Sequence, residues 1–204
     1  QPHFVILQTD HARACGQLAE AFGNQRFAAV TPNEPVVYAV AHHDEGWIET
    51  DNMVLRNPAT GLPFTLTETP LPYLVNTSEG SPEFNERFHP YSGLLSSMHT
   101  YGLYHGRYGL SDFLFIERIT TELKDMVDDM LAAEMARQEK IKTALNAHES
   151  TAKWVDDDFL FANYKLLQFF DTLALYLQMT HPGAQGRTEF KNVPDDEGND
   201  VTIV

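Results

Sequence analysis

The chain has 204 residues, of which 43% are hydrophobic and 21% charged, a composition typical of a folded globular protein. Its 14 basic and 29 acidic residues give a net charge of −15, and no cluster of Lys and Arg interrupts this acidity. We therefore expect neither long nucleic acids nor anionic membranes among its partners. No apolar run reaches the roughly 18 residues that a membrane-spanning helix needs.

A chain of this length can build one well-formed core, so residues 1–204 are expected to form a single domain. Cys15 is the only cysteine, which excludes an internal disulfide. Its neighbours Ala14 and Leu18 predict that it is a small buried side chain. No secretory signal is visible, so a cytoplasmic location is the expectation.

Two helices are predicted in the N-terminal part of the chain. Asp10 is a suitable N-cap for a helix over about residues 11–22, and Pro35 suits the first turn of a helix over about residues 35–45. From about residue 46 to 90, repeated proline and glycine predict a long loop. Loops of this length are uncommon unless they serve a site, so we expect this one to form the mouth of a pocket.

Helical spacing returns over about residues 90–104 and continues through a long amphipathic stretch over 111–147. This stretch exceeds the usual length of a globular helix, which predicts a bend or a break. It either folds onto its own core, the commoner case, or mediates a homodimer. A further helix over about 158–180 and a C-terminal tail over 187–204 that suits a small hairpin complete a mainly α fold.

Helical geometry predicts which histidines of the first two helices face the core. At 100° per residue, His11 shares a face with the apolar side chains of Ala14, Cys15, Leu18 and Phe22. On the second helix His43 continues the stripe of Val36 and Val40, with Asp44 on its flank and His42 on the opposite side. His11, His43 and Asp44 are therefore expected to point into the core.

Asp171 lies in the middle of the 158–180 helix, which is apolar nearly all round, as a central buried helix would be. A carboxylate in such a place is costly unless it is paired or binds a cation. No Lys or Arg lies one turn away on its face, so a metal is the economical explanation. On the 90–104 helix, His99 shares a face with Leu95 and Leu103, so its imidazole is also expected to point into the core.

Each inward histidine alone is more often a core residue than a ligand. The combination of imidazoles and carboxylates on expected core faces is what indicates a metal site. Nitrogen together with oxygen ligands suits a divalent transition ion (Mn, Fe, Co, Ni or Zn) rather than calcium.

The order His, His-Asp, Asp on separate helices resembles the HD superfamily of metal-dependent phosphohydrolases. The run His43-Asp44-Glu45-Gly46 resembles the HD-x-G form common in that group. Longer runs resemble a bacterial family of unknown activity, which we interpret as a divergent HD branch; the resemblance covers most of residues 4–180 and rests on the runs Gln8–Ala12, His42–Trp47, Asn57–Gly61 and Ser97–His99.

The resemblance implies a helical HD-like fold and four metal ligands, His11, His43, Asp44 and Asp171. Binuclear members of the superfamily add further histidines, and here His99 is the best candidate for that role. Whether the site holds one metal ion or two therefore stays open.

The main functional hypothesis is a hydrolase that uses a metal-activated water on a small phosphoester or a related small molecule. Asp44 would bridge two metals or hold the water, Glu45 or Asp51 would accept a proton, and His99 would protonate the leaving group.

Three further residues are candidates for substrate binding. Arg107 would bind an anion, although an exposed arginine in a turn is the commoner reading of its sequence context. Trp47 and Tyr101 would line the pocket, unless they are simply core residues. Two alternatives to hydrolysis remain, an HD-type di-iron oxygenase that cleaves its substrate with O₂ and a metal-stabilised ligand-binding protein without catalysis.

Overall fold

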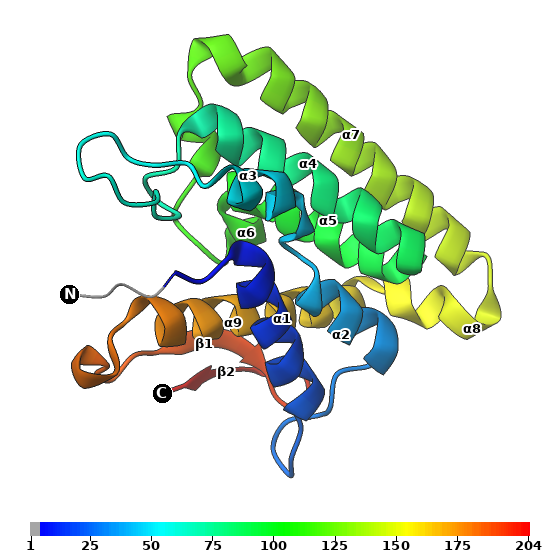
Figure 1. Cartoon of the computed structure of the whole chain (residues 1–204). Coiled ribbons are helices and arrows are strands. Elements are labelled where there is room, and N and C mark those ends of the chain that lie inside the picture. The colour runs from blue at the N-terminus through cyan, green and yellow to red at the C-terminus, as the bar shows by residue number, and fades with distance from the viewer. Residues whose placement is uncertain (1–4) are drawn as a thin grey trace.

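The computed structural model describes residues 5–204, and Figure 1 shows helices throughout most of the chain. The helices are α1 (Gln8–Ala21), α2 (Asn33–Ala41), α3 (Ile48–Met53), α4 (Leu71–Phe88), α5 (Pro90–Tyr104), α6 (Gly106–Gly109), α7 (Thr121–Asn146), α8 (Glu149–Ala152) and α9 (Asp157–Met179). Short 3-10 turns lie at η1 (Glu45–Trp47), η2 (Phe115–Arg118), η3 (Lys153–Val155) and η4 (Pro182–Ala184). The strands β1 (Phe190–Pro194) and β2 (Asp200–Ile203) pair antiparallel. The expected mainly α fold with a small C-terminal β element is confirmed.

The helices form two groups that meet along α5 (Figure 1). In one group α4, α5 and α7 pack side by side, and in the other α1 packs against α2 and α9, with the hairpin on α9. Helix α5 also contacts α2 and α9, so it connects the groups. Within residues 5–204, none of the helices combines the length and the apolar character that crossing a bilayer would require.

Helix α5 is buried along almost its whole length, and its small residues explain how it fits between its neighbours. A side chain at Gly93 would meet the Cα of Glu86 on α4 at 2.7 Å. Ser92 and Ser97 donate hydrogen bonds to the backbone carbonyls of Pro35 and Glu134, at 2.7 and 3.2 Å. These hydroxyls satisfy their own buried donors while they join α5 to the elements on either side.

The long loop predicted over residues 46–90 is wrong, because α4 occupies Leu71–Phe88. Pro82 lies inside this helix, where it removes the hydrogen bond that the carbonyl of Ser78 would normally accept. That carbonyl instead accepts a hydrogen bond from the Thr100 hydroxyl of α5, at 3.3 Å. A tertiary contact thus replaces the bond that proline takes away, and the helix continues.

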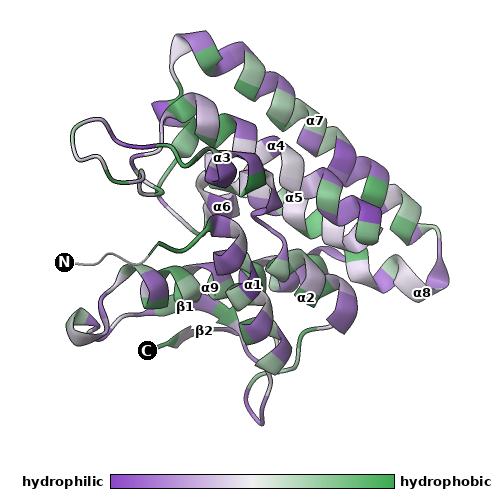
Figure 2. Ribbon diagram, in the orientation of Figure 1, coloured by the Kyte–Doolittle hydropathy of each residue, from purple (hydrophilic) through white to green (hydrophobic). Residues whose placement is uncertain are grey.

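The break predicted in the 111–147 stretch is confirmed, since η2 and a short irregular segment precede α7, which begins at Thr121. Along α7 the buried side chains recur at helical spacing, from Val127 through Met130 and Leu131 to Ile141 and Leu145. Figure 2 shows this amphipathic character as polar and apolar turns that alternate along the helix. Helix α7 packs its buried side against α5.

Candidate metal centre

Three separate segments bring His11, His43, Asp44 and Asp171 to one place. His11 lies on α1, Asp171 lies on α9, and the His-Asp pair follows the end of α2. The Nε2 atom of His11 is 3.2 Å from Asp171 Oδ1, and the Nε2 atom of His43 is 3.9 Å from that same oxygen. His43 Nε2 is also 3.5 Å from Asp44 Oδ2. The four residues expected from the sequence therefore form one cluster.

The His43-Asp44 pair lies in a turn and not on a helix, because α2 ends at Ala41 instead of near residue 45 as predicted. Helix α4 holds this turn from one side. The Asn85 side-chain amide donates to the carbonyl of His42 at 2.8 Å, and the Ser81 hydroxyl accepts from the amide of Gly46 at 2.9 Å. The segment that was expected to be a loop is thus a rigid support for the centre.

The hydrogen bonds of His43 determine which of its nitrogens is free. Its Nδ1 donates to the backbone carbonyl of Val40 at 2.7 Å, so Nε2 carries a lone pair. The residue is only 2% exposed, and within the described part of the chain Nε2 has no hydrogen-bond partner. A buried nitrogen lone pair directed at two carboxylates is the arrangement of a metal ligand whose other nitrogen is fixed by the backbone.

His11 is held in the same way. Its Nδ1 donates to the Gln178 side-chain carbonyl at 2.8 Å, which leaves Nε2 directed at Asp171 and at the Cys15 sulfur. Burial lowers the pKa of His11, but its contacts with Asp171 and Cys15 outweigh burial and raise that pKa to about 11. Without a cation, a proton therefore occupies the position beside Asp171 that a metal ion would take.

Asp171 is 5% exposed, and its charge is balanced from two sides. Burial opposes ionisation, but the hydrogen bond from His11 and the positive charges nearby hold its pKa well below the usual value. The sequence shows no Lys or Arg one turn away on the same helix face, but Arg107 from another segment of the chain places Nη2 3.6 Å from Oδ2. Oδ1 still faces the two histidines.

Arg107 reaches the centre from a turn of unusual backbone geometry. Gly106, Arg107, Tyr108 and Gly109 all have positive φ, at 60°, 52°, 55° and 89°. Left-handed conformations cost roughly 1–2 kcal/mol for each residue with a side chain. The turn therefore concentrates strain beside the cluster, where it directs the guanidinium toward Asp171.

His99 lies next to the cluster, with its ring centroid 5.0 Å from that of His43. His43, Asp44 and His99 each offer a ligand atom within 4.8 Å of the other two. The Gln168 side-chain amide donates to His99 Nδ1 at 2.8 Å, which places the remaining hydrogen on Nε2. Burial, aided by His43, lowers the pKa of His99 to about 3, so this imidazole is neutral.

Three other expected site residues, Glu45, Tyr101 and Asp51, are not among the described residues that line the cavity beside the cluster. Glu45 turns away from it, and its carboxylate pairs with Nδ1 of His42 at 2.5 Å. Tyr101 stacks on His105 at a centroid distance of 4.3 Å and is not among the described residues that line the cavity. Asp51 accepts a hydrogen bond from the amide of Gln8 at 3.0 Å, which satisfies a free donor at the first turn of α1.

A cavity of about 650 Å³ opens beside the cluster. The expected residues Trp47, His99 and Arg107 line it together with the four clustered residues. Sequence reasoning missed several further lining groups, which are polar residues of the 67–81 region and of the segment before α7: Thr67, Glu68, Thr77, Ser78, Ser81, Ser111 and Arg118. A second cavity of about 700 Å³ lies next to it, and six residues line both: Gln8, His11, Trp47, Leu66, Thr69 and Leu175.

Fold and cluster define a mainly α protein with a buried His-Asp centre at the wall of a cavity that polar and apolar side chains line together. The chain belongs to the family described as "Protein of unknown function (DUF3891)", whose match covers residues 1–204. No curated protein and no solved structure matches the chain.

Proposed function

We propose that this protein is a metal-dependent hydrolase of a small phosphoester or related anionic molecule, and a divergent relative of the HD superfamily. The observation that carries the proposal is the buried Nε2 of His43, which finds no hydrogen-bond partner among residues 5–204 and faces the carboxylates of Asp44 and Asp171. Buried polar atoms are nearly always satisfied, so such an atom needs an explanation. A bound cation supplies one.

The residues present fit a divalent transition ion. His11 and His43 offer Nε2 lone pairs, and Asp44 and Asp171 offer carboxylate oxygens, a donor set that suits Mn, Fe, Co, Ni or Zn. The hydrogen on Nε2 of His99 makes it a donor in this arrangement, which favours one ion over two.

When bound, such an ion polarises a phosphoryl oxygen and lowers the pKa of a water, which makes a nucleophile available near neutral pH. Asp44 borders the cavity and is placed to accept a hydrogen bond from that water. Burial raises the pKa of Asp44, which makes its carboxylate a better proton acceptor. Because His99 is neutral, its Nε2–H group donates a hydrogen bond to a substrate or leaving-group oxygen without giving up the proton.

The cavity lining supports a small anionic substrate. Arg107 and Arg118 bring positive charge to a protein that is otherwise strongly acidic, and the hydroxyls of Ser78 and Ser111 add hydrogen-bond partners. A volume of about 650 Å³ is that of a small-molecule site.

Metal analysis of His43→Ala and of its neighbour His42→Ala tests the site. Both substitutions remove an imidazole from the same turn, but His42 pairs with Glu45 and does not line the cavity. We expect the protein and the His42→Ala variant to bind about one equivalent of metal, and the His43→Ala variant to lose it. Equal metal content in both variants would remove the basis of the proposal.

A panel of phosphomonoesters, phosphodiesters and nucleotides, assayed with and without oxygen, tests the chemistry. We expect metal-dependent hydrolysis that does not change under anaerobic conditions. Turnover that requires iron and O₂ would contradict hydrolysis and support an oxygenase. Metal-dependent stabilisation without turnover of any substrate would contradict an enzymatic role.

A further inference from the structure

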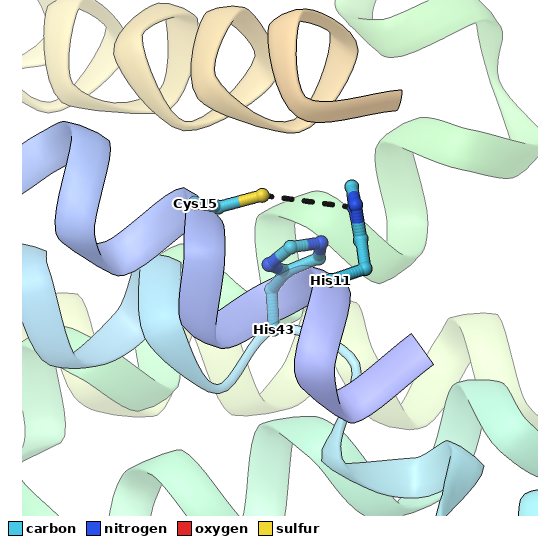
Figure 3. Close-up of side chains that lie close together, drawn as sticks. All are labelled: His11, Cys15 and His43. Carbon is cyan, nitrogen blue, oxygen red and sulfur yellow. Dashed lines mark hydrogen bonds between the residues drawn. The ribbon is translucent and has the colours of Figure 1, made fainter. Parts of the chain in front are cut away.

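The sulfur of Cys15 lies on the buried side of the centre. Cys15 and His11 are one helical turn apart on α1, and Sγ is 3.6 Å from Nε2 of His11. His11, Cys15 and His43 each offer a ligand atom within 4.8 Å of the other two. Figure 3 shows the three side chains gathered between α1 and the turn that carries His43.

We propose that the Cys15 thiolate is a ligand of the same cation that His11 and His43 bind, which makes the centre selective for a thiophilic ion. This inference rests on the proposed metal site and adds to it a sulfur donor and a choice of metal. Thiolate ligands favour Zn²⁺, Co²⁺ or Fe²⁺ over Mg²⁺ and Mn²⁺.

The spacing of the atoms supports a shared ion. Metal–nitrogen bonds of about 2.0–2.1 Å and metal–sulfur bonds of about 2.3 Å put two neighbouring donors roughly 3.1 Å apart at an octahedral angle and, as the angle widens to the tetrahedral one, roughly 3.5 Å apart. The Sγ–Nε2 distance of 3.6 Å between Cys15 and His11 is close to this value. His43 is 2% exposed, and its Nε2, for which the described residues offer no hydrogen-bond partner, completes the cluster from a second segment of the chain.

The surroundings of Cys15 suit a ligand better than a reactive thiol. The residue is 0% exposed and, within the described part of the chain, it lines neither cavity, so a substrate cannot reach it. Sulfur would bind from the core side, which leaves the cavity side open for water and substrate. On binding, the thiol S–H bond breaks, the sulfur keeps the electron pair, and the proton passes to the buffer.

Cobalt spectroscopy tests this assignment in the unaltered protein. Because the chain has one cysteine, any thiolate-to-cobalt charge-transfer band must come from Cys15. The metal-free protein, reduced with a phosphine and freed of any affinity tag, is titrated with Co²⁺ without oxygen. We expect a near-ultraviolet charge-transfer band that saturates at one equivalent, together with visible d–d bands.

The Cys15→Ser variant should keep the d–d bands and lose the charge-transfer band. Its affinity for Zn²⁺ should fall by at least about tenfold, the loss that even an outer-shell change causes. Ala19→Ser is the matched control, since it places a hydroxyl on the same buried face of α1, one turn beyond Cys15. This control should retain both bands.

Two results would overturn the assignment, and they differ in what they say of the hydrolase. Saturable d–d bands without a charge-transfer band in the unaltered protein would exclude the sulfur ligand and leave the metal-dependent hydrolase intact. The absence of Co²⁺ binding, checked by equilibrium dialysis with Zn²⁺ as well, would refute both proposals.

Discussion

The two oxygens of the Asp171 carboxylate face different partners. Oδ1 lies 3.2 Å from Nε2 of His11, whereas Oδ2 lies 3.6 Å from Nη2 of Arg107. Because a guanidinium keeps its charge at all relevant pH values, Oδ2 is permanently balanced and Oδ1 is the oxygen available to a cation. Arg107 therefore has two tasks, since it balances Asp171 and also lines the cavity.

Replacement of Arg107 by glutamine should weaken substrate binding. Hydrogen bonds to charged groups contribute about 1.5–3 kcal/mol, so we expect KM for an anionic substrate to rise roughly 10- to 100-fold. Steady-state kinetics with metal analysis of the same sample would measure this. Arg13→Gln, at an exposed arginine that pairs with Asp10, should leave KM unchanged. An unchanged KM in the Arg107→Gln variant would exclude Arg107 from the substrate site.

At the scale of elements, the left-handed turn at Gly106–Gly109 is the feature most sensitive to a small change. Gly109 has φ of 89° and open space around it, so alanine would add backbone strain without a clash. We expect Gly109→Ala to lower the free energy of unfolding by about 1–2 kcal/mol. Chemical denaturation of the metal-free protein would measure this.

Gly186→Ala is the control for that substitution. Gly186 also has open space around it, but its φ is not positive. Its replacement should be neutral or should stabilise the protein by about 0.4–1 kcal/mol through the unfolded chain. Equal effects of the two alanines would show that the left-handed backbone carries no strain.

The stability that the N-cap of α5 contributes should depend on pH. His89 is the N-cap, and its Nδ1 accepts a hydrogen bond from the amide of Tyr91 at 3.0 Å. Burial lowers the pKa of His89, with Glu34 opposing, so the folded protein binds this proton less readily than the unfolded chain does. Stability should therefore fall as pH drops through about 6.5, the usual value for histidine.

The His89→Asn variant tests this, since asparagine caps a helix and does not titrate. The free energy of unfolding should change less between pH 7.5 and pH 5.5 in the variant than in the unaltered protein. The two changes should differ by up to about 1 kcal/mol, the free energy that an N-cap contributes. The same pH dependence in both proteins would mean that protonation of His89 does not affect the cap.

For the whole molecule, the centre joins segments that lie far apart in the chain. His11 and Asp171 are separated by 160 positions, and both lie on helices of the same buried cluster. A cation held at 100 times its dissociation constant would stabilise the folded state by about 2.7 kcal/mol. Removal of metal by a chelator should lower Tm, and Zn²⁺ should restore it. In the His43→Ala variant the chelator should have no effect on Tm.

Much of the helical order could be predicted because local signals and packing agree. Helix α9 is apolar nearly all round and is central, and Pro35 lies in the first turn of α2. Helix α4 could not be predicted, because what permits Pro82 inside it is a hydrogen bond from Thr100, which lies on another helix. The residues around Pro82 in the sequence do not indicate that a distant hydroxyl makes this hydrogen bond.

The candidate site was predictable to the extent that helix periodicity places side chains. It placed His11 and Asp171 on inward faces, and these residues lie 3.2 Å apart. It did not place Glu45, the candidate proton acceptor, whose carboxylate pairs with His42 in the turn after the early end of α2. It missed Ser78, because that residue lies on the helix that was taken for a loop.

The side chains shared by the two cavities have a consequence for the size of both. His11, Trp47 and Leu175 are among the residues that line both spaces, so one of the four clustered residues, His11, borders both cavities. The Trp47 indole is likewise common to the walls of both cavities, so a smaller side chain at this position would enlarge both spaces beside His11.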